Sequence, residues 1–275
     1  MQIVRFVSSD IDNRDPYQSG AQLGLLKAPS VVIPLAHTSL GDLHATVRQG
    51  LEPVQSQAPP IPLSDLHLLP PSAPSKIVCV GLNYRHHAEE MNKPIPAEPL
   101  IFLKAPSALL SPMEPIILPD ASALVHHEGE MAVVIGQRTC RVTEAEAMGC
   151  ILGVTCMNDV TARDIQRREG GRYSRAKGFD TFAPCGPSLT LGVDPNDLEV
   201  SCAVNGHVRQ RSSTRDLIFS VETVIAFVSS IMTLMPGDII STGTPSGVGP
   251  LVDGDHVSVE VSGVGVLNNP VKALQ

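Results

Sequence analysis

The hydrophobic and polar residues alternate along much of the chain, which favours β-strands. The stretch LEVSCAVNGHVRQRSS predicts a hairpin over residues 198–213, because strand-like alternation flanks Asn205-Gly206, the strongest two-residue turn signal. Residues 237–267 likewise alternate glycine turns with segments rich in Val and Ile. The pattern therefore predicts a strand-dominated α+β fold with a few short helices.

Two stretches have apolar residues at helical spacing. SLGDLHATVRQG predicts a helix within residues 39–50, and SVETVIAFVSSIMTL predicts one over residues 220–234. In the second stretch Ser220 is a suitable N-cap, and Pro236-Gly237 stops the helix. A smaller number of helices than strands is therefore expected.

A proline-rich stretch divides the chain. Residues 51–76 (LEPVQSQAPPIPLSDLHLLPPSAPSK) predict a linker that lies on a surface, after which KIVCVGLNY begins the main part. We expect a small N-terminal α+β domain with its linker over residues 1–70 and a larger domain over residues 71–275.

The composition narrows the class of protein. The chain has 275 residues, 43% of them hydrophobic and 17% charged, with a formal net charge of -8. This acidic balance disfavours nucleic acid as a partner, and no apolar run approaches the ~20 residues of a membrane helix. The six cysteines form no C-x-x-C pair, and the N-terminus lacks a signal-peptide pattern, so a reducing cytoplasm is expected.

The stretch VHHEGEMAVVIG, residues 125–136, places two acids in front of an apolar run. Residues i and i+2 of a strand point to the same face, so Glu128 and Glu130 would direct their carboxylates together. A shared proton, an arginine, or a hard cation would each compensate this charge. An E-x-E pair is also common at a solvated strand edge.

A third acid, Asp159, follows the strand-like stretch ILGVTCMN and precedes a helix expected from Val160 to about Glu169. An acid there is often only a helix cap. Three carboxylates without cysteine or paired histidine ligands nevertheless suit an oxygen-seeking ion such as Mg²⁺ or Mn²⁺. The spacing alone leaves both interpretations open.

Several blocks in this order resemble the fumarylacetoacetate hydrolase superfamily: KIVCVGLNYRHHAEEM, FLKAPSALLSP, VHHEGEMAVVIG, MNDVTARDIQ, RAKGFDTFAPCGPSL and GDIISTGTPSGVG. The resemblance covers about residues 65–272 and is closest to the short-chain branch. That branch includes oxaloacetate decarboxylases or tautomerases, acylpyruvate hydrolases, and isomerases of 2-oxo-heptenedioates. It implies a mixed β-sandwich or roll, and commonly a homodimer.

The resemblance also implies roles for particular residues. Glu128, Glu130 and Asp159 match the ligands of a divalent ion, usually Mg²⁺ with Mn²⁺ as the alternative, and Lys177 matches the active-site lysine. His87 and Glu90, three residues apart and so on one helical face, match a catalytic pair carried by a lid. His86 and Glu89 have the same spacing, so a shifted register is an alternative.

Four further residues are candidates for binding a small oxo acid. Gln166 matches a family position that contacts substrate, and Gly243 and Thr244 lie in a glycine-rich loop whose N–H groups and hydroxyl could hold a carboxylate. Arg175 could bind a distal carboxylate, although an exposed arginine is the more common reading.

The resemblance implies chemistry on a 2-oxo or β-dicarbonyl acid, in which a bond at C3 breaks and gives an enolate stabilised by the ion. Hydrolysis of a C–C bond or decarboxylation is the first expectation, and tautomerisation is the alternative. A non-catalytic relative that binds a metal or a small acid is an alternative of another class. A glycosidase is disfavoured because two acids on one strand flank a glycosidic bond poorly.

Overall fold

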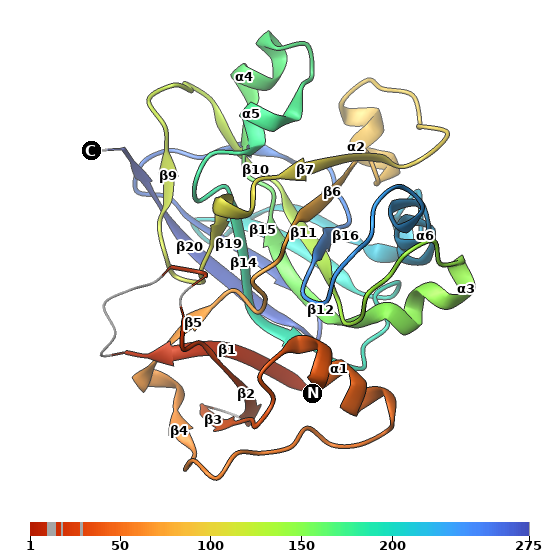
Figure 1. The fold of residues 1–275 in the computed structure, drawn as a ribbon. Helices are drawn as coiled ribbons and strands as arrows, with labels where there is room; N and C mark the ends of the chain where they lie inside the picture. Colours follow the sequence, from red (N-terminus) through yellow and green to blue (C-terminus); the bar gives the residue numbers. More distant parts are fainter. Residues whose placement is uncertain (10–14, 18, 28–29, 275) are drawn as a thin grey trace.

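The computed structural model describes residues 1–9, 15–17, 19–27 and 30–274. Three sheets carry most of this part of the chain, and short helices lie at their edges (Figure 1). The predicted strand-dominated α+β class is confirmed.

The largest sheet has twelve described strands, and it holds the acids of interest. Two strands lie off its main path: β5 (Leu66–Leu69) pairs with β1, and β8 (Leu109–Leu110) pairs with β14. The main path runs in the spatial order β4 (Ile61–Pro62), β3 (Val31–Pro34), β2 (Gln22–Lys27), β1 (Gln2–Ser8), β14 (Ala183–Thr190), β12 (Ile151–Asn158), β11 (Gly129–Ile135), β17 (Ile239–Ser241), β6 (Ile77–Gly81) and β7 (Leu100–Lys104).

Two smaller sheets complete the strands. The three-stranded sheet has the order β13 (Thr161–Ala162), β10 (Val125–His127) and β18 (Gly249–Pro250). The five-stranded sheet has the order β16 (His207–Ser213), β15 (Glu199–Val204), β19 (His256–Val261), β20 (Gly265–Ala273) and β9 (Ile116–Leu118). Because β10 and β11 follow each other in the chain, residue 128 lies where the chain passes from one sheet to another.

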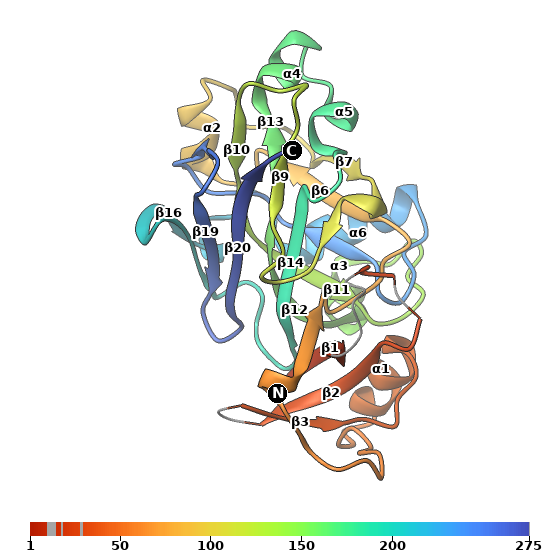
Figure 2. The same ribbon diagram turned by 90° about the vertical axis from the view of Figure 1, so that its left-hand side faces the viewer.

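The described helices are short. The α-helices are α1 (Leu40–Arg48), α2 (Arg85–Glu90), α3 (Glu144–Ala147), α4 (Arg163–Arg168), α5 (Tyr173–Lys177) and α6 (Val221–Ile231). The 3-10 turns are η1 (Leu63–Asp65), η2 (Pro106–Ala108), η3 (Met148–Cys150) and η4 (Thr214–Asp216). Figures 1 and 2 both show α2, α4 and α5 at one end of the molecule, with α1 and β1–β3 at the other.

The local predictions agree closely with these elements. β15 and β16 form the expected hairpin, with Asn205 and Gly206 both at positive φ in its turn. Ser220 caps α6 by accepting a hydrogen bond from the Thr223 N–H, as its side-chain chemistry predicts. The sequence also placed α1 correctly, and Ser39 caps it in the same way.

The prediction for the proline-rich stretch is wrong in part. It contains β5, which pairs with β1 and buries Leu66 and Leu69, so it does not simply lie on a surface. β1 also pairs with β14, which joins the strands before and after residue 70 in one sheet. The domain boundary expected at residue 70 stays a prediction.

The core lies between the main sheet and the five-stranded sheet, and it includes Val154, Val259 and Leu267. The two sheets approach closely at Gly129, where a Cβ atom would lie 2.7 Å from the Cβ atom of Cys202. A glycine is required there, next to both glutamates, because any side chain would separate the sheets. In the described part of the chain, no helix is long and apolar enough to cross a membrane.

Candidate active site

The three predicted acids meet at one point of the main sheet. Glu130 is in β11, and Asp159 directly follows the neighbouring antiparallel strand β12, in which Asn158 pairs with Gly129. Glu128 lies between β10 and β11, where its N–H donates to Asn158 Oδ1 at 2.9 Å and its C=O accepts from the Asp159 N–H at 2.8 Å. One carboxylate oxygen from each acid lies within 4.8 Å of the others, and all three residues are buried.

The helix expected to start after Asp159 begins later than predicted. The chain first forms the short strand β13, and α4 begins only at Arg163, with Ala162 as its N-cap. The carboxylate of Asp159 therefore does not cap a helix. It points instead into the acid cluster, where cations from other elements contact it.

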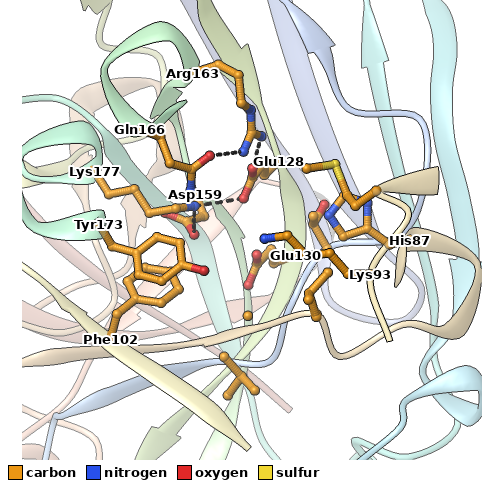
Figure 3. Close-up of a pocket in the computed structure, with 15 residues that line it drawn as sticks. His87, Lys93, Phe102, Glu128, Glu130, Asp159, Arg163, Gln166, Tyr173 and Lys177 are labelled. Carbon is orange, nitrogen blue, oxygen red and sulfur yellow. Dashed lines mark hydrogen bonds and ion pairs between the residues drawn. The ribbon is translucent and has the colours of Figure 1, made fainter. Parts of the chain in front are cut away.

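Three buried cations contact two of the acids. Lys104 Nζ donates to Asp159 Oδ1 at 2.7 Å, and Lys177 Nζ donates to Glu128 Oε2 at 2.8 Å and also to Asp159 Oδ2. The guanidinium of Arg163 donates to Glu128 Oε1 (Figure 3). Buried carboxylates require such partners, because removing an ion from water costs several kcal/mol.

These contacts separate the pKa values of the two glutamates. Burial opposes the ionised form of Glu128, but the charges of Lys177 and Arg163 outweigh it and hold its pKa well below the usual range. Burial and the nearby charge of Asp159 raise the pKa of Glu130 to about 8. Burial also opposes the charge of Lys177, but the carboxylates of Asp159 and Glu128 outweigh it and raise the lysine pKa.

Glu130 is the acid that most needs a further cation. Its Oε2 atom accepts from Ser241 Oγ at 2.5 Å and from the Gly243 N–H at 2.9 Å, and no cationic side chain of the described residues pairs with it. Three buried carboxylates, one of them without a cation, are a suitable donor set for a hard divalent ion. Glu128, Glu130 and Asp159 could therefore bind such a metal.

Three residues of α2 and of the loop of residues 91–99, a segment called the lid below, line the pocket that contains the acid cluster: His87, Met91 and Lys93. His87 Nδ1 lies 2.9 Å from Glu90 Oε2, and Glu90 Oε1 accepts from the Gly247 N–H at 3.0 Å. His87 lines the pocket, and its side chain is 8% exposed. In the alternative pair, the side chains of His86 and Glu89 are each 74% exposed. The structure thus brings His87, and not His86, to the acids.

The base of the lid is fixed by Asn83, which is fully buried. Its side chain donates to the C=O groups of Phe219 and Thr242 and accepts from the Phe219 N–H. Its own C=O accepts from the Ile218 N–H at 2.8 Å. These bonds fix the start of α2 relative to the glycine-rich loop, so the position of His87 follows from them.

The opposite wall of the pocket comes from α4, α5 and β7. Gln166 Oε1 accepts from Arg163 Nη1 at 2.5 Å, which leaves the amide N–H groups of Gln166 to donate to a bound molecule. The ring of Tyr173 stacks on that of Phe102 with centroids 4.5 Å apart, and Lys177 Nζ lies 4.9 Å from the Phe102 centroid. Burial raises the pKa of Tyr173, so its hydroxyl stays a neutral donor.

The glycine-rich loop contacts the acid cluster, and its predicted role in binding substrate stays a prediction. The Gly243 N–H donates to Glu130 and so orients an acid. Thr244 lines the pocket, but its hydroxyl donates to the Gly129 C=O and accepts from Gln210 Nε2. Arg175 lies outside the pocket with a 56% exposed side chain and pairs with Glu169.

Sequence reasoning missed several pocket residues. Arg163, Tyr173, Phe102 and Lys93 line the pocket, and Lys104 contacts Asp159 beneath it. Phe102 and Lys104 lie in FLKAPSALLSP, and Arg163 lies in MNDVTARDIQ, so the resemblance had already included these residues without a role. Tyr173 and Lys93 lie outside the quoted blocks, and local pattern gave no signal for them.

Comparison with protein families agrees with the geometry. The family described as fumarylacetoacetate (FAA) hydrolase C-terminal matches residues 76–272. This range includes the acids, the lid and the lysines of the pocket.

Several individual proteins are similar over nearly the whole chain. The mitochondrial oxaloacetate tautomerase FAHD2B of Homo sapiens is 38% identical over 98% of this chain and 91% of its own. A 2-hydroxyhepta-2,4-diene-1,7-dioate isomerase structure from Mycobacterium marinum has 39% identity and a TM-score of 0.85, covering 99% of this chain and 98% of its own. A maleylpyruvate hydrolase structure from Sphingobium sp. SYK-6, in complex with manganese (II) ion and pyruvate, has 30% identity and a TM-score of 0.78, covering 100% of both chains.

Proposed function

The chain belongs to the fumarylacetoacetate hydrolase family, and on this basis we propose that it catalyses the keto–enol tautomerisation of a small 2-oxo acid with a divalent cation. The observation that carries this proposal is the hydrogen bond between His87 and Glu90 in the same pocket as three buried carboxylates. Tautomerisation needs a cation that polarises the 2-oxo group of the acid and a group that moves a proton at C3. The names of the human and M. marinum relatives support this choice of reaction.

Glu128, Glu130 and Asp159 would hold the cation, with Mg²⁺ proposed and Mn²⁺ as the alternative. A divalent ion at this position would polarise the 2-oxo group of the acid and stabilise negative charge on its oxygen. The manganese in the Sphingobium relative supports such a site.

His87 is proposed to move the proton at C3. If the Glu90 carboxylate accepts a hydrogen bond from the Nδ1–H group, the Nε2 atom is unprotonated and can act as a base. In the keto-to-enol direction, Nε2 takes a proton from C3, the electrons of the C–H bond form the C2–C3 double bond, and the 2-oxo oxygen becomes negative. The proton on Nε2 then exchanges with solvent, which restores the base, and in the reverse direction Nε2 delivers a proton to C3.

Lys177 is proposed to act at the 2-oxo oxygen. Its ammonium group donates a hydrogen bond to the developing oxyanion and transfers a proton that completes the enol, and solvent later restores the lysine. Gln166 would donate from its amide to a carboxylate of the same acid, while Arg163 holds that amide in place. Each residue thus acts on a different atom of the substrate.

C–C bond hydrolysis or decarboxylation, the first expectation from the sequence, is the second candidate. The name of the Sphingobium relative favours hydrolysis. All three reactions share the enolate, but hydrolysis also requires a water molecule that His87 activates. A homodimer in the cytoplasm remains the proposed state of the enzyme.

An ultraviolet assay tests the proposal. The enol form of oxaloacetate is added to the purified protein with Mg²⁺, and the loss of enol absorbance is followed beside a separate assay for pyruvate. We expect the protein to accelerate ketonisation above a Mg²⁺-only control, and EDTA to abolish the acceleration. No acceleration, or pyruvate release at the rate of enol loss, would contradict it.

A further inference from the structure

We propose that Lys93, in the lid, determines specificity by binding the second carboxylate of a dicarboxylate substrate. This inference rests on the proposed function for the position of the first carboxylate at the acid cluster. Lys93 lines the same pocket as His87 and the three acids. Figure 3 shows its side chain extending from the lid into the pocket, toward the acid cluster.

The backbone at Lys93 is fixed by the end of α2. Asn92 has a φ of 52°, and its N–H donates to the C=O of Glu89. The Lys93 N–H donates to the C=O of Ala88 at 3.0 Å, and this pair of bonds is a Schellman motif. Pro94 then prevents any extension of the helix. The backbone of Lys93 is therefore held at a set position relative to His87, six residues before it.

Lys93 differs from the other pocket cations in having a free charge. Lys177 and Arg163 are already bonded to Glu128, and Lys104 to Asp159. Within the described residues, the ammonium group of Lys93 has neither a hydrogen bond nor an acid within ion-pair distance. A bound molecule can therefore use its charge without breaking an existing pair.

The charges of the pocket favour a dianion over a monoanion. Three carboxylates are balanced by the three cations that contact two of them: Glu128, Glu130 and Asp159 against Lys104, Arg163 and Lys177. A bound divalent cation and Lys93 then add three positive charges. A dicarboxylate neutralises two of these charges and a monocarboxylate only one, and the second carboxylate is the one that Lys93 can pair with.

Calorimetric binding with inert ligands tests the proposal without any turnover. In Mg²⁺, malate is compared with 2-hydroxybutyrate, which has a methyl group in place of the second carboxylate. We expect wild-type protein to prefer malate, Lys93→Met to reduce that preference about tenfold, as for one charge-assisted hydrogen bond, and Lys93→Arg to retain most of it. Lys272→Met, an exposed lysine outside the pocket, is the matched control.

Kinetics provides a second readout. The ratio of kcat/KM for oxaloacetate to that for acetylpyruvate, which has an acetyl group in place of the second carboxylate, should fall about tenfold in Lys93→Met. The loss should lie in KM for oxaloacetate. An unchanged malate preference in Lys93→Met, or no such preference in wild type, would overturn the proposal even if tautomerisation itself is confirmed. If tautomerisation fails, the binding experiment still decides the role of Lys93.

Discussion

Glu128 and Glu130 lie in the same cluster of carboxylates, but only Glu128 contacts cationic side chains among the described residues. Glu128 pairs with Lys177 and Arg163, whereas Glu130 accepts only from a hydroxyl and a backbone N–H group. Without a metal ion, one acid of the cluster is therefore fully compensated and the other is not.

This difference predicts that the free energy of unfolding of the metal-free protein depends on pH through Glu130. Burial and the Asp159 charge raise the pKa of Glu130 to about 8, so the folded state keeps a proton that the unfolded state loses near pH 4.5. Between these values the folded state binds more protons, so this residue lowers the free energy of unfolding as pH rises, on the order of 1 kcal/mol per pH unit. Urea unfolding of wild type and Glu130→Gln in EDTA, from pH 5 to pH 8, should show the variant gaining relative stability.

The same proton predicts how Mg²⁺ binding responds to pH. Because Glu130 must lose its proton to bind a cation, the Mg²⁺ affinity should rise with pH up to about 8 and then level off. Calorimetry in buffers of different ionisation enthalpy measures the protons released. A pH-independent affinity without proton release would show that Glu130 is ionised before the metal binds.

Lys104 should stabilise the metal-free protein and weaken the binding of a metal ion. It is 1% exposed, and its ammonium group bonds Asp159, so Lys104→Met leaves a buried charge with one fewer partner and should cost about 3 kcal/mol of folding free energy. Since the cluster then has more negative charge, Mg²⁺ should raise the Tm of the variant more than that of wild type. Equal Mg²⁺-induced shifts in Tm would contradict this.

The two histidines of α2 provide a matched pair of variants. His87→Asn should lower kcat for tautomerisation by roughly 10² to 10⁴, the usual contribution of a general acid or base. His86→Asn should leave it unchanged, because His86 is 74% exposed and outside the pocket. Circular dichroism checks that both variants fold. Equal effects of the two substitutions on kcat would show that the imidazole of His87 has no specific role in proton transfer.

Gly243 should be needed for Mg²⁺ binding as well as for its backbone conformation. Its φ is 104°, and a Cβ atom there would lie 2.8 Å from Cβ of Asn83, whereas Gly254, with a φ of 86°, has open space around it. Both Gly→Ala changes should cost about 1 kcal/mol from the positive φ. Only Gly243→Ala should also weaken Mg²⁺ binding, because its N–H orients Glu130. Equal Mg²⁺ affinities in the two variants would argue against that role.

The shared face of Glu128 and Glu130 could be predicted from the sequence because the two residues are only two positions apart. Asp159, which directly follows the strand that pairs with β11, was joined to them by the family resemblance and not by local spacing. The choice of His87 over His86 followed from counting residues along the chain from Asn83 and Tyr84. The helix cap at Ser220 was predicted from a local pattern, since the side chain bonds an N–H group three residues away.

Of the buried cations only Lys177 was predicted, and it came from the resemblance. The roles of Lys104 and Arg163 and the edges of the fold depend on tertiary contacts that local pattern does not contain. Lys104 is 55 residues from Asp159 in sequence, and Arg163 is 35 residues from Glu128. The pairing of β5 with β1 similarly joins distant segments, and its proline-rich surroundings gave the local appearance of a linker. The late start of α4 also follows from the pairing of β13 with β10, a contact that no local pattern contains.

The most direct test of the proposed tautomerisation is the exchange of the C3 protons of oxaloacetate in D₂O, followed by NMR in Mg²⁺. The same spectrum records pyruvate, so proton transfer and decarboxylation are measured together. We predict that wild-type protein introduces deuterium at C3 well before pyruvate accumulates, and that His87→Asn slows this exchange at least about a hundredfold. Exchange no faster than in protein-free solution, or pyruvate formed as fast as deuterium enters, would contradict the account.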